Sequence, residues 1–173
     1  LVGADSLRYN YADEIRGEIE LDQEGNIVVG TCTWSDDFPV TQNSFQQDKG
    51  EFKDGVVFRF NPTMSNLIHS SYYGGSGDDA VYSIHIGEEG DITAAGGTNS
   101  VDLQASSNAV QASFAGGTTD GFVVVLNESI SSVEHMTYYG SDAYEQIYFV
   151  DLDPEGFPHI YGQTEASGST FIS

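Results

Sequence analysis

Residues 54–61 read Asp-Gly-Val-Val-Phe-Arg-Phe-Asn, and residues 120–127, 66 positions later (120 − 54), read Asp-Gly-Phe-Val-Val-Val-Leu-Asn. Two other stretches return at almost the same spacing. The Tyr-Tyr-Gly-Gly of residues 72–75 returns as the Tyr-Tyr-Gly-Ser of residues 138–141, and residues 38–46 return, with more changes, as residues 103–111. A fixed period of this length predicts stacked structural repeats, none of which buries its apolar face alone.

Each period predicts four short strands. The first alternates, with Ile19 and Leu21 on one side and Glu20 on the other, and ends at a turn that carries glycine. The second is rich in small residues, the third is apolar almost without alternation, and the fourth ends in paired tyrosines. An apolar strand of this kind is covered on both faces. Four antiparallel strands per repeat, sandwiched between neighbours, predict an all-β chain of β-propeller blades.

The repeat boundaries divide the chain unevenly. Residues 1–73 form the first blade, which begins in mid-repeat at Leu1-Val2-Gly3, residues 74–139 form the second, and residues 140–173 form part of a third. The total is about 2.6 blades, whereas propellers close with four to eight. We therefore expect a section of a larger array, completed by other blades of the same polypeptide or by neighbouring chains.

The order of these motifs over residues 72–127 resembles the SBBP repeat, a bacterial β-propeller repeat. The resemblance is close there, fair over residues 17–71, and weak after Thr164; the first repeat departs from it with an insertion at residues 5–12. The resemblance implies a secreted or surface-displayed protein of the kind frequent in Bacteroidota and often exported by type IX secretion. It implies a scaffold and no particular reaction.

The chain is strongly acidic, with 27 Asp and Glu against 5 Lys and Arg and a net charge of −22. Such a field repels nucleic acid and anionic membrane surfaces, so neither is an expected partner, and no apolar stretch is long enough to insert into a membrane. Carboxylates in this number keep a protein soluble and offer ligands to divalent cations.

The single cysteine, Cys32, excludes a disulfide within the chain and is expected to be buried.

Two acidic clusters are candidate cation sites. The turn with Asp151, Asp153 and Glu155 places alternate carboxylates before a glycine, as at the start of calcium loops, so Ca²⁺ is the implied ion; a plain hydrogen-bonded turn is the alternative. The pairs Asp78-Asp79 and Asp13-Glu14 occupy a matched position at the start of a strand. They bind a cation between blades or accept hydrogen bonds from the glycine-rich turn.

The long polar loops are the predicted recognition surface, because a rigid sheet presents them from one side. Their candidate residues are Trp34, Asp36, Asp37, Phe38 and Asp102. An exposed tryptophan beside carboxylates suits a glycan or a surface protein, and a tryptophan packed over the blade edge is the alternative.

The sequence favours a non-catalytic protein. His69 and His135 recur 66 positions apart (135 − 69), as structural positions do, and no motif of a metalloprotease, serine hydrolase, redox dithiol or phosphate loop occurs. We expect an extracellular or cell-surface scaffold that acts in adhesion or protein interaction. A subunit of an extracellular fibre or envelope assembly is one alternative, and the propeller domain of a carbohydrate-active or proteolytic enzyme is another. The short glycosylation patterns Asp5-Ser6-Leu7 and Asn127-Glu128-Ser129 agree with an extracellular location.

Overall fold

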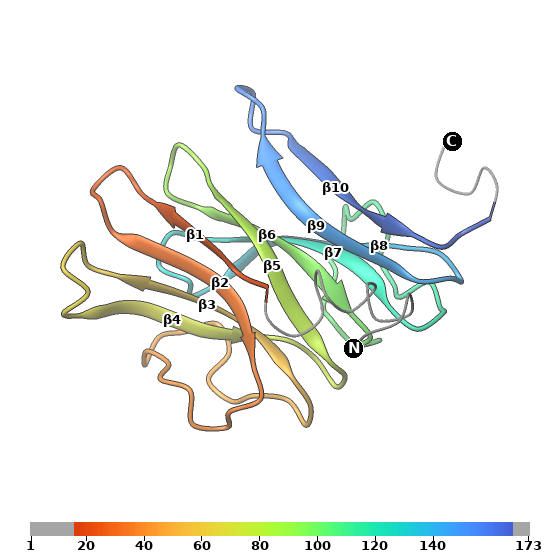
Figure 1. Ribbon diagram of the computed structural model, residues 1–173, viewed down its shortest axis with the longest axis horizontal. Helices are drawn as coiled ribbons and strands as arrows, with labels where there is room; N and C mark the ends of the chain where they lie inside the picture. Colours follow the sequence, from red (N-terminus) through yellow and green to blue (C-terminus); the bar gives the residue numbers. More distant parts are fainter. Residues whose placement is uncertain (1–15, 168–173) are drawn as a thin grey trace, which may run out of the picture.

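The computed structural model describes residues 16–167, which form ten β-strands in antiparallel sheets (Figure 1). Sheet 1 contains β1 (Glu18–Leu21), β2 (Ile27–Thr33), β3 (Asp54–Phe60) and β4 (Leu67–Tyr73). Sheet 2 contains β5 (Asp79–Ile86), β6 (Ile92–Thr98), β7 (Asp120–Leu126) and β8 (Val133–Tyr139). Sheet 3 is the hairpin of β9 (Glu145–Leu152) and β10 (Pro158–Thr164).

The all-β prediction is confirmed, and the predicted strand segments of each period are strands. In sheets 1 and 2 the strands follow one another in chain order, each antiparallel to the next. The third strand is mostly buried in both sheets, as its continuous apolar sequence predicts: Val56, Val57, Phe122 and Val124 have no exposed surface. In sheet 2 the second strand, β6, is buried along its whole length. The described residues form no closed sheet.

The hairpin turns are set by glycine. The turns after β1, β5 and β9 contain Gly25, Gly90 and Gly156, whose φ angles are +79°, +84° and +84°. A residue with a Cβ rarely adopts this left-handed backbone, whereas glycine does so at little cost. The three turns therefore have the same shape although their other residues differ.

The sheets stack face to face in chain order, because each first strand packs on the sheet before it. Strand β5 lies against β1, β2 and β3 of sheet 1, and β9 lies against β5, β6 and β7 of sheet 2. Figure 1 shows β1, β5 and β9 side by side across the molecule. The main hydrophobic core includes Val28 and Val57 of sheet 1 with Val81 and Ile84 of sheet 2.

A small residue makes this close stacking possible. A Cβ on Gly30 would lie 2.5 Å from Ile84 Cγ2 and 2.7 Å from Val81 Cγ1, so the side chains of β5 occupy the space that a larger residue would need.

We expect Gly30→Val to lower the free energy of unfolding by about 1–3 kcal/mol, because an overpacked core must shift its neighbours. Urea unfolding followed by tryptophan fluorescence measures this change. The control, Ala112→Val in an exposed loop, should change stability by less than about 0.5 kcal/mol. Equal effects of the two substitutions would contradict the close packing of sheets 1 and 2.

The outer face of sheet 1 is more exposed than the equivalent face of sheet 2. Ile19, Leu21 and Met64 are 66%, 67% and 67% exposed, whereas Ile84 and Ile130, which are equivalent to Ile19 and Met64, are buried. Ile130 is covered by the loop that contains Phe45, whose N–H donates to the Ile130 carbonyl (3.0 Å). Positions that are buried in sheet 2 are therefore exposed to solvent on the outer face of sheet 1.

Three predictions for the N-terminal segment lie outside the described residues. They are the strand end at Leu1-Val2-Gly3, the insertion at residues 5–12 with its Asp5-Ser6-Leu7 pattern, and the pair Asp13-Glu14.

Candidate functional site

Two long loops, residues 34–53 and residues 99–119, connect the second and third strands of sheets 1 and 2. Each is held by a tyrosine of the fourth strand. The Tyr72 hydroxyl accepts a hydrogen bond from Phe38 N–H (3.0 Å) and donates one to the Ser35 carbonyl (2.8 Å). The same bonds recur in sheet 2 at Tyr138, Leu103 and Ser100. The first tyrosine of each Tyr-Tyr-Gly motif therefore anchors a loop.

A glutamine ties the far end of each loop to the third strand. Gln46 accepts a hydrogen bond from Gly74 N–H at Oε1 (3.0 Å) and donates one from Nε2 to Asp54 Oδ2 (2.8 Å). The same bonds recur at Gln111, Gly140 and Asp120. Burial raises the pKa of both aspartates, against the hydrogen bonds that lower it. The aspartate of each Asp-Gly motif thus has a structural role.

Asp79 holds the glycine-rich turn before β5. Its carboxylate accepts hydrogen bonds from Gly75 N–H (2.8 Å), from the Ser100 hydroxyl (2.7 Å) and from the Thr98 hydroxyl. Glu145 has the equivalent role before β9, with Ser141 and Thr164 as donors. The hydrogen-bonding alternative for Asp79 is therefore confirmed. Burial raises its pKa to about 6, although these hydrogen bonds act in the opposite direction.

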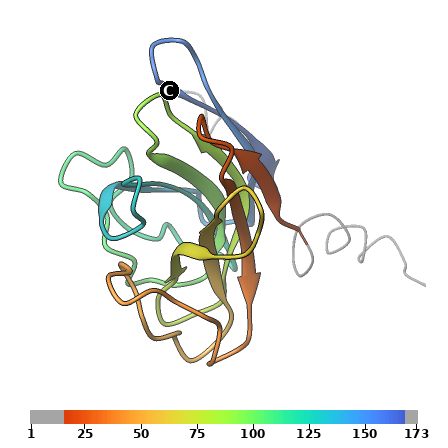
Figure 2. The ribbon, with the colours of Figure 1, turned by 90° about the vertical axis from the view of Figure 1, so that its left-hand side faces the viewer.

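Three of the predicted recognition residues are exposed on the first long loop. Trp34 is 55% exposed, and the Lys53 ammonium lies 5.3 Å from the centre of its ring. Asp36 pairs with Lys49 (3.1 Å), and Asp37 accepts a hydrogen bond from the Ser35 hydroxyl. The Trp34 ring is thus partly covered and partly exposed, so packing over the blade edge and recognition both stay predictions. The loop lies at the lower end of the molecule in Figure 2.

The other two predicted recognition residues have structural contacts. The Phe38 ring packs between Phe58 (5.4 Å between ring centres) and Tyr72 (6.1 Å) and so helps to anchor the loop. Asp102 lies on the second long loop and accepts hydrogen bonds from the Ser76 N–H (2.9 Å) and hydroxyl (3.0 Å), which lower its pKa. Asp102 is nevertheless exposed, whereas Phe38 is half-buried.

A groove of about 810 Å³ lies between the β5–β6 and β9–β10 hairpins, at the opposite end from the first long loop. Its apolar lining includes Ile86, Val125 and Leu152. The acidic residues that line it are Glu88, Glu89, Asp91, Glu134, Asp153 and Glu155.

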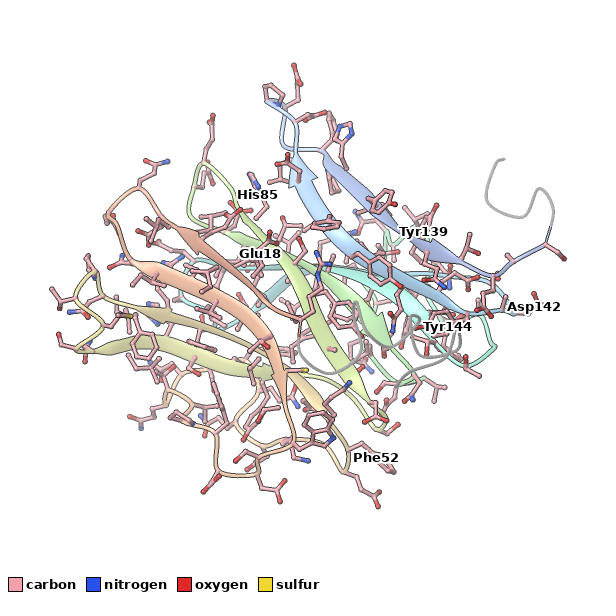
Figure 3. The ribbon with its side chains drawn as sticks, viewed as in Figure 1. Glu18, Phe52, His85, Tyr139, Asp142 and Tyr144 are labelled. Carbon is pink, nitrogen blue, oxygen red and sulfur yellow. The ribbon has the colours of Figure 1, made fainter. Side chains whose placement is uncertain are left out.

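Beside this groove, one position of each first strand forms a row that crosses all three sheets. His85 Nδ1 lies 3.6 Å from Glu20 Oε1 and 3.1 Å from Asp151 Oδ1. Glu18 adds a second link, since its Oε2 accepts hydrogen bonds from the Ser83 hydroxyl (2.5 Å) and Ile84 N–H (2.9 Å). Glu18 and His85 are labelled in Figure 3. The alternation of the first strands predicts that Glu20, His85 and Asp151 lie on the same side of their strands. The distances between them depend on how the sheets stack.

The calcium candidates do not converge. Asp153 Oδ1 accepts hydrogen bonds from Glu155 N–H (3.0 Å) and Phe157 N–H (2.8 Å) of its own turn, and these lower its pKa. Asp151 faces His85, and Glu155 is exposed. Asp22 makes the same kind of turn in sheet 1. Within residues 16–167 no three His, Cys, Asp or Glu side chains are grouped to hold a metal ion. The hydrogen-bonded turn therefore accounts for Asp153.

We expect addition of millimolar Ca²⁺, or of a chelator, to leave the melting temperature of the protein unchanged. Differential scanning calorimetry in both conditions measures this. A ligand that binds only the folded state raises stability by about 2.7 kcal/mol at a hundredfold excess over its Kd. A calcium-dependent increase that Asp153→Asn removes would restore the calcium hypothesis.

The remaining residues of interest have contacts within the fold. His69 and His135 lie on β4 and β8, opposite Arg59 and Val125 of the third strands, and burial lowers the pKa of His69. Cys32 is half-buried and packs against Tyr82 and Tyr148, so the prediction of a buried thiol is confirmed only in part. In the part of the chain that the structure describes, no helix has the length and apolar character needed to cross a membrane.

No protein-family model matches this chain, and no curated protein matches it. The resemblance to the SBBP repeat therefore stays an expectation.

Proposed function

We propose that this protein is a section of a β-propeller that serves as a non-catalytic scaffold and interaction module on the cell surface or outside the cell. The observation that carries the proposal is the repetition of its buried polar contacts. Tyr72 and Tyr138, Gln46 and Gln111, and Asp79 and Glu145 make equivalent hydrogen bonds in successive repeats. A catalytic group is needed once, whereas a group that every repeat uses in the same way supports the fold.

The stacking of the sheets supports the propeller arrangement. In a propeller the first strands of successive blades lie next to one another around the centre. Here β1, the first strand of sheet 1, contacts the open edge of β5, the first strand of sheet 2. Ile84 N–H and Ile86 N–H of β5 donate hydrogen bonds to the carboxylates of Glu18 and Glu20 (both 2.9 Å). Val150 N–H of β9 donates in turn to the Ser83 hydroxyl of β5 (3.0 Å).

The first long loop is the proposed recognition surface. Tyr72 anchors its start through Ser35 and Phe38, and Gln46 anchors its far end. Trp34 and Asp36, next to the first anchor, are exposed to solvent. An aromatic ring beside carboxylates suits the apolar face and the hydroxyl groups of a sugar, so glycans and glycosylated surface proteins are the proposed partners.

Electron microscopy of the polypeptide as the cell makes it tests the architecture. We expect a ring of four-stranded sheets around a central axis, and a linear solenoid or a two-sheet sandwich would contradict it. A glycan array tests the recognition surface. Trp34→Ala is expected to reduce binding, and Phe157→Ala, at a somewhat more exposed aromatic residue on the β9–β10 turn, is expected to leave it unchanged. Hydrolysis of peptide or glycoside substrates by the purified protein would contradict a non-catalytic role.

A fibre or envelope subunit is the second candidate, and the outer face of sheet 1 favours it. Ile19, Leu21 and Met64 are exposed at positions equivalent to buried or half-buried residues of sheet 2, so this apolar surface suits a neighbouring chain as well as another blade of the same polypeptide. Electron micrographs that contain only discrete rings, each formed by one polypeptide, would exclude this candidate.

A further inference from the structure

His85 lies between two carboxylates that belong to the sheets on either side of its own (Figure 3). Its Nδ1 atom is 3.6 Å from Glu20 Oε1 of β1 and 3.1 Å from Asp151 Oδ1 of β9. Strands β1, β5 and β9 belong to three separate sheets. One imidazole ring therefore contacts acidic groups of both neighbouring sheets.

The other charged groups that face His85 are acidic. On β1, Glu18 lies two residues from Glu20, and both carboxylates accept hydrogen bonds from amides of β5. Strands β2 and β6, which also pack against β5, contain no charged residue. The groove beside His85 contributes the remaining acidic side chains. They are Glu88, Glu89, Asp91, Glu134, Asp153 and Glu155.

The basic side chains of the neighbouring strands have other partners. Arg16 precedes β1 and lies over an aromatic ring of β9. Arg59 of β3 lies 3.6 Å from Asp22 Oδ2, and His159 of β10 lies 3.3 Å from Asp153 Oδ2. The positive charge that these contacts supply is thus directed at carboxylates other than Glu20 and Asp151.

The protonation state of His85 decides whether Glu20 and Asp151 face a positive charge. A neutral ring donates at most one N–H from Nδ1 and leaves two negative charges on opposite sides of it. A protonated ring attracts both carboxylates. Burial raises the pKa of Glu20, and the charges of Glu18 and Asp151 add to this effect, whereas the hydrogen bond from Ile86 N–H and the charge of His85 lower it.

We propose that His85 is a pH-dependent link between the three sheets, in which the protonated ring holds Glu20 and Asp151 together. Histidine side chains titrate near neutral pH, so the link is present in mild acid and is lost as the pH rises and the ring releases its proton. It is also lost in stronger acid, where the carboxylates are protonated. This property of the stack goes beyond the proposed scaffold role and does not depend on what the first long loop recognises.

His85→Asn tests the proposal in the purified protein, because asparagine has a neutral amide where histidine has Nδ1. We compare the melting temperatures of native and variant protein at pH 6 and pH 8. The native protein should exceed the variant by about 2–4 °C more at pH 6 than at pH 8, the shift that a link of ordinary strength produces in a protein of this size. All other titrating groups are common to both proteins and cancel in the comparison.

His159→Asn is the matched control. Its side chain is 70% exposed, against 30% for His85, and its carboxylate partner, Asp153, belongs to the same hairpin. Because water screens an exposed pair, the difference between this variant and the native protein should change by less than about 1 °C over the same pH interval. Equal pH dependence of the two variants would overturn the proposal.

Hydrogen exchange at Ile86 reports the contact between β1 and β5 directly, since this N–H donates to Glu20 Oε2. After correction for the pH dependence of free amides, its protection should fall about twofold to fivefold from pH 6 to pH 8 in the native protein and in His159→Asn. It should stay constant in His85→Asn. If the His85 ring titrates in NMR spectra of the native protein with no change at the Ile86 amide, the proposal is wrong, and this result does not depend on whether the variants fold.

Discussion

Replacement of Phe122 by alanine is expected to lower the free energy of unfolding by about 3–5 kcal/mol, the usual cost of removing a buried phenylalanine from a core. The Phe122 side chain is fully buried and contacts the ring of Tyr73 from sheet 1, so its loss weakens both sheet 2 and the interface between the sheets. Chemical denaturation monitored by circular dichroism measures the change. This is a large fraction of the stability of an ordinary domain.

Phe157→Ala is the matched control, because it makes the same chemical change at a side chain that is 66% exposed. It should lower stability by less than about 1 kcal/mol. If the two variants are equally stable, Phe122 does not occupy the position between the sheets that the structure assigns to it.

Asp79 is expected to make the protein more stable in mild acid than at neutral pH. Burial raises its pKa from 3.8 to about 6, with a smaller contribution from the negative charge of Asp54. A carboxyl group with a raised pKa in the folded state favours folding when it is protonated. Its stabilising effect is therefore complete below pH 3.8 and is lost as the pH rises through about 6. Since each pKa unit corresponds to about 1.4 kcal/mol, the change over this interval is about 3 kcal/mol.

Asp79→Asn should remove this dependence. The Thr98 and Ser100 hydroxyls that contact the carboxylate can rotate to accept or to donate hydrogen bonds, so an amide has partners in the same place. The stability of the native protein relative to the variant should fall as the pH rises from 4 to 7. The measurement is the melting temperature of both proteins at several pH values in that range. Parallel curves would contradict the assigned burial of Asp79.

Asp102→Asn provides a control of opposite sign. Hydrogen bonds from Ser76 lower the pKa of Asp102, so its stabilising effect is present above pH 3.8 and is lost as the pH falls. The native protein should therefore be more stable than Asp102→Asn at neutral pH, and this advantage should shrink in acid. The native protein should be less stable than Asp79→Asn at neutral pH, and this disadvantage should shrink in acid. Asp54 and Asp120 also have raised pKa values, so the comparison of variant with native protein isolates Asp79 from them.

Part of the candidate site could be predicted from sequence because it lies within one repeat. The long loops begin and end beside strands whose alternation and tyrosine pairs are visible in the sequence, and Trp34 and Asp36 are exposed where a recognition surface was expected. The inward packing of Phe38 was not predictable, since it depends on Phe58 and Tyr72 from two different strands. The calcium hypothesis assumed that carboxylates spaced closely in the turn point toward one ion. Instead, the Asp153 carboxylate accepts hydrogen bonds from backbone N–H groups of the same turn.

The strands, their antiparallel order within each repeat and the glycine turns could be predicted from the amino-acid sequence, because alternation, continuous apolar runs and backbone preferences act over a few neighbouring residues. Which faces of the sheets meet is visible only in the three-dimensional structure. The row of Glu20, His85 and Asp151, and the contact of Phe122 with Tyr73, join residues from different repeats. Such contacts depend on the offset between stacked sheets, and side-chain packing across the interface sets that offset.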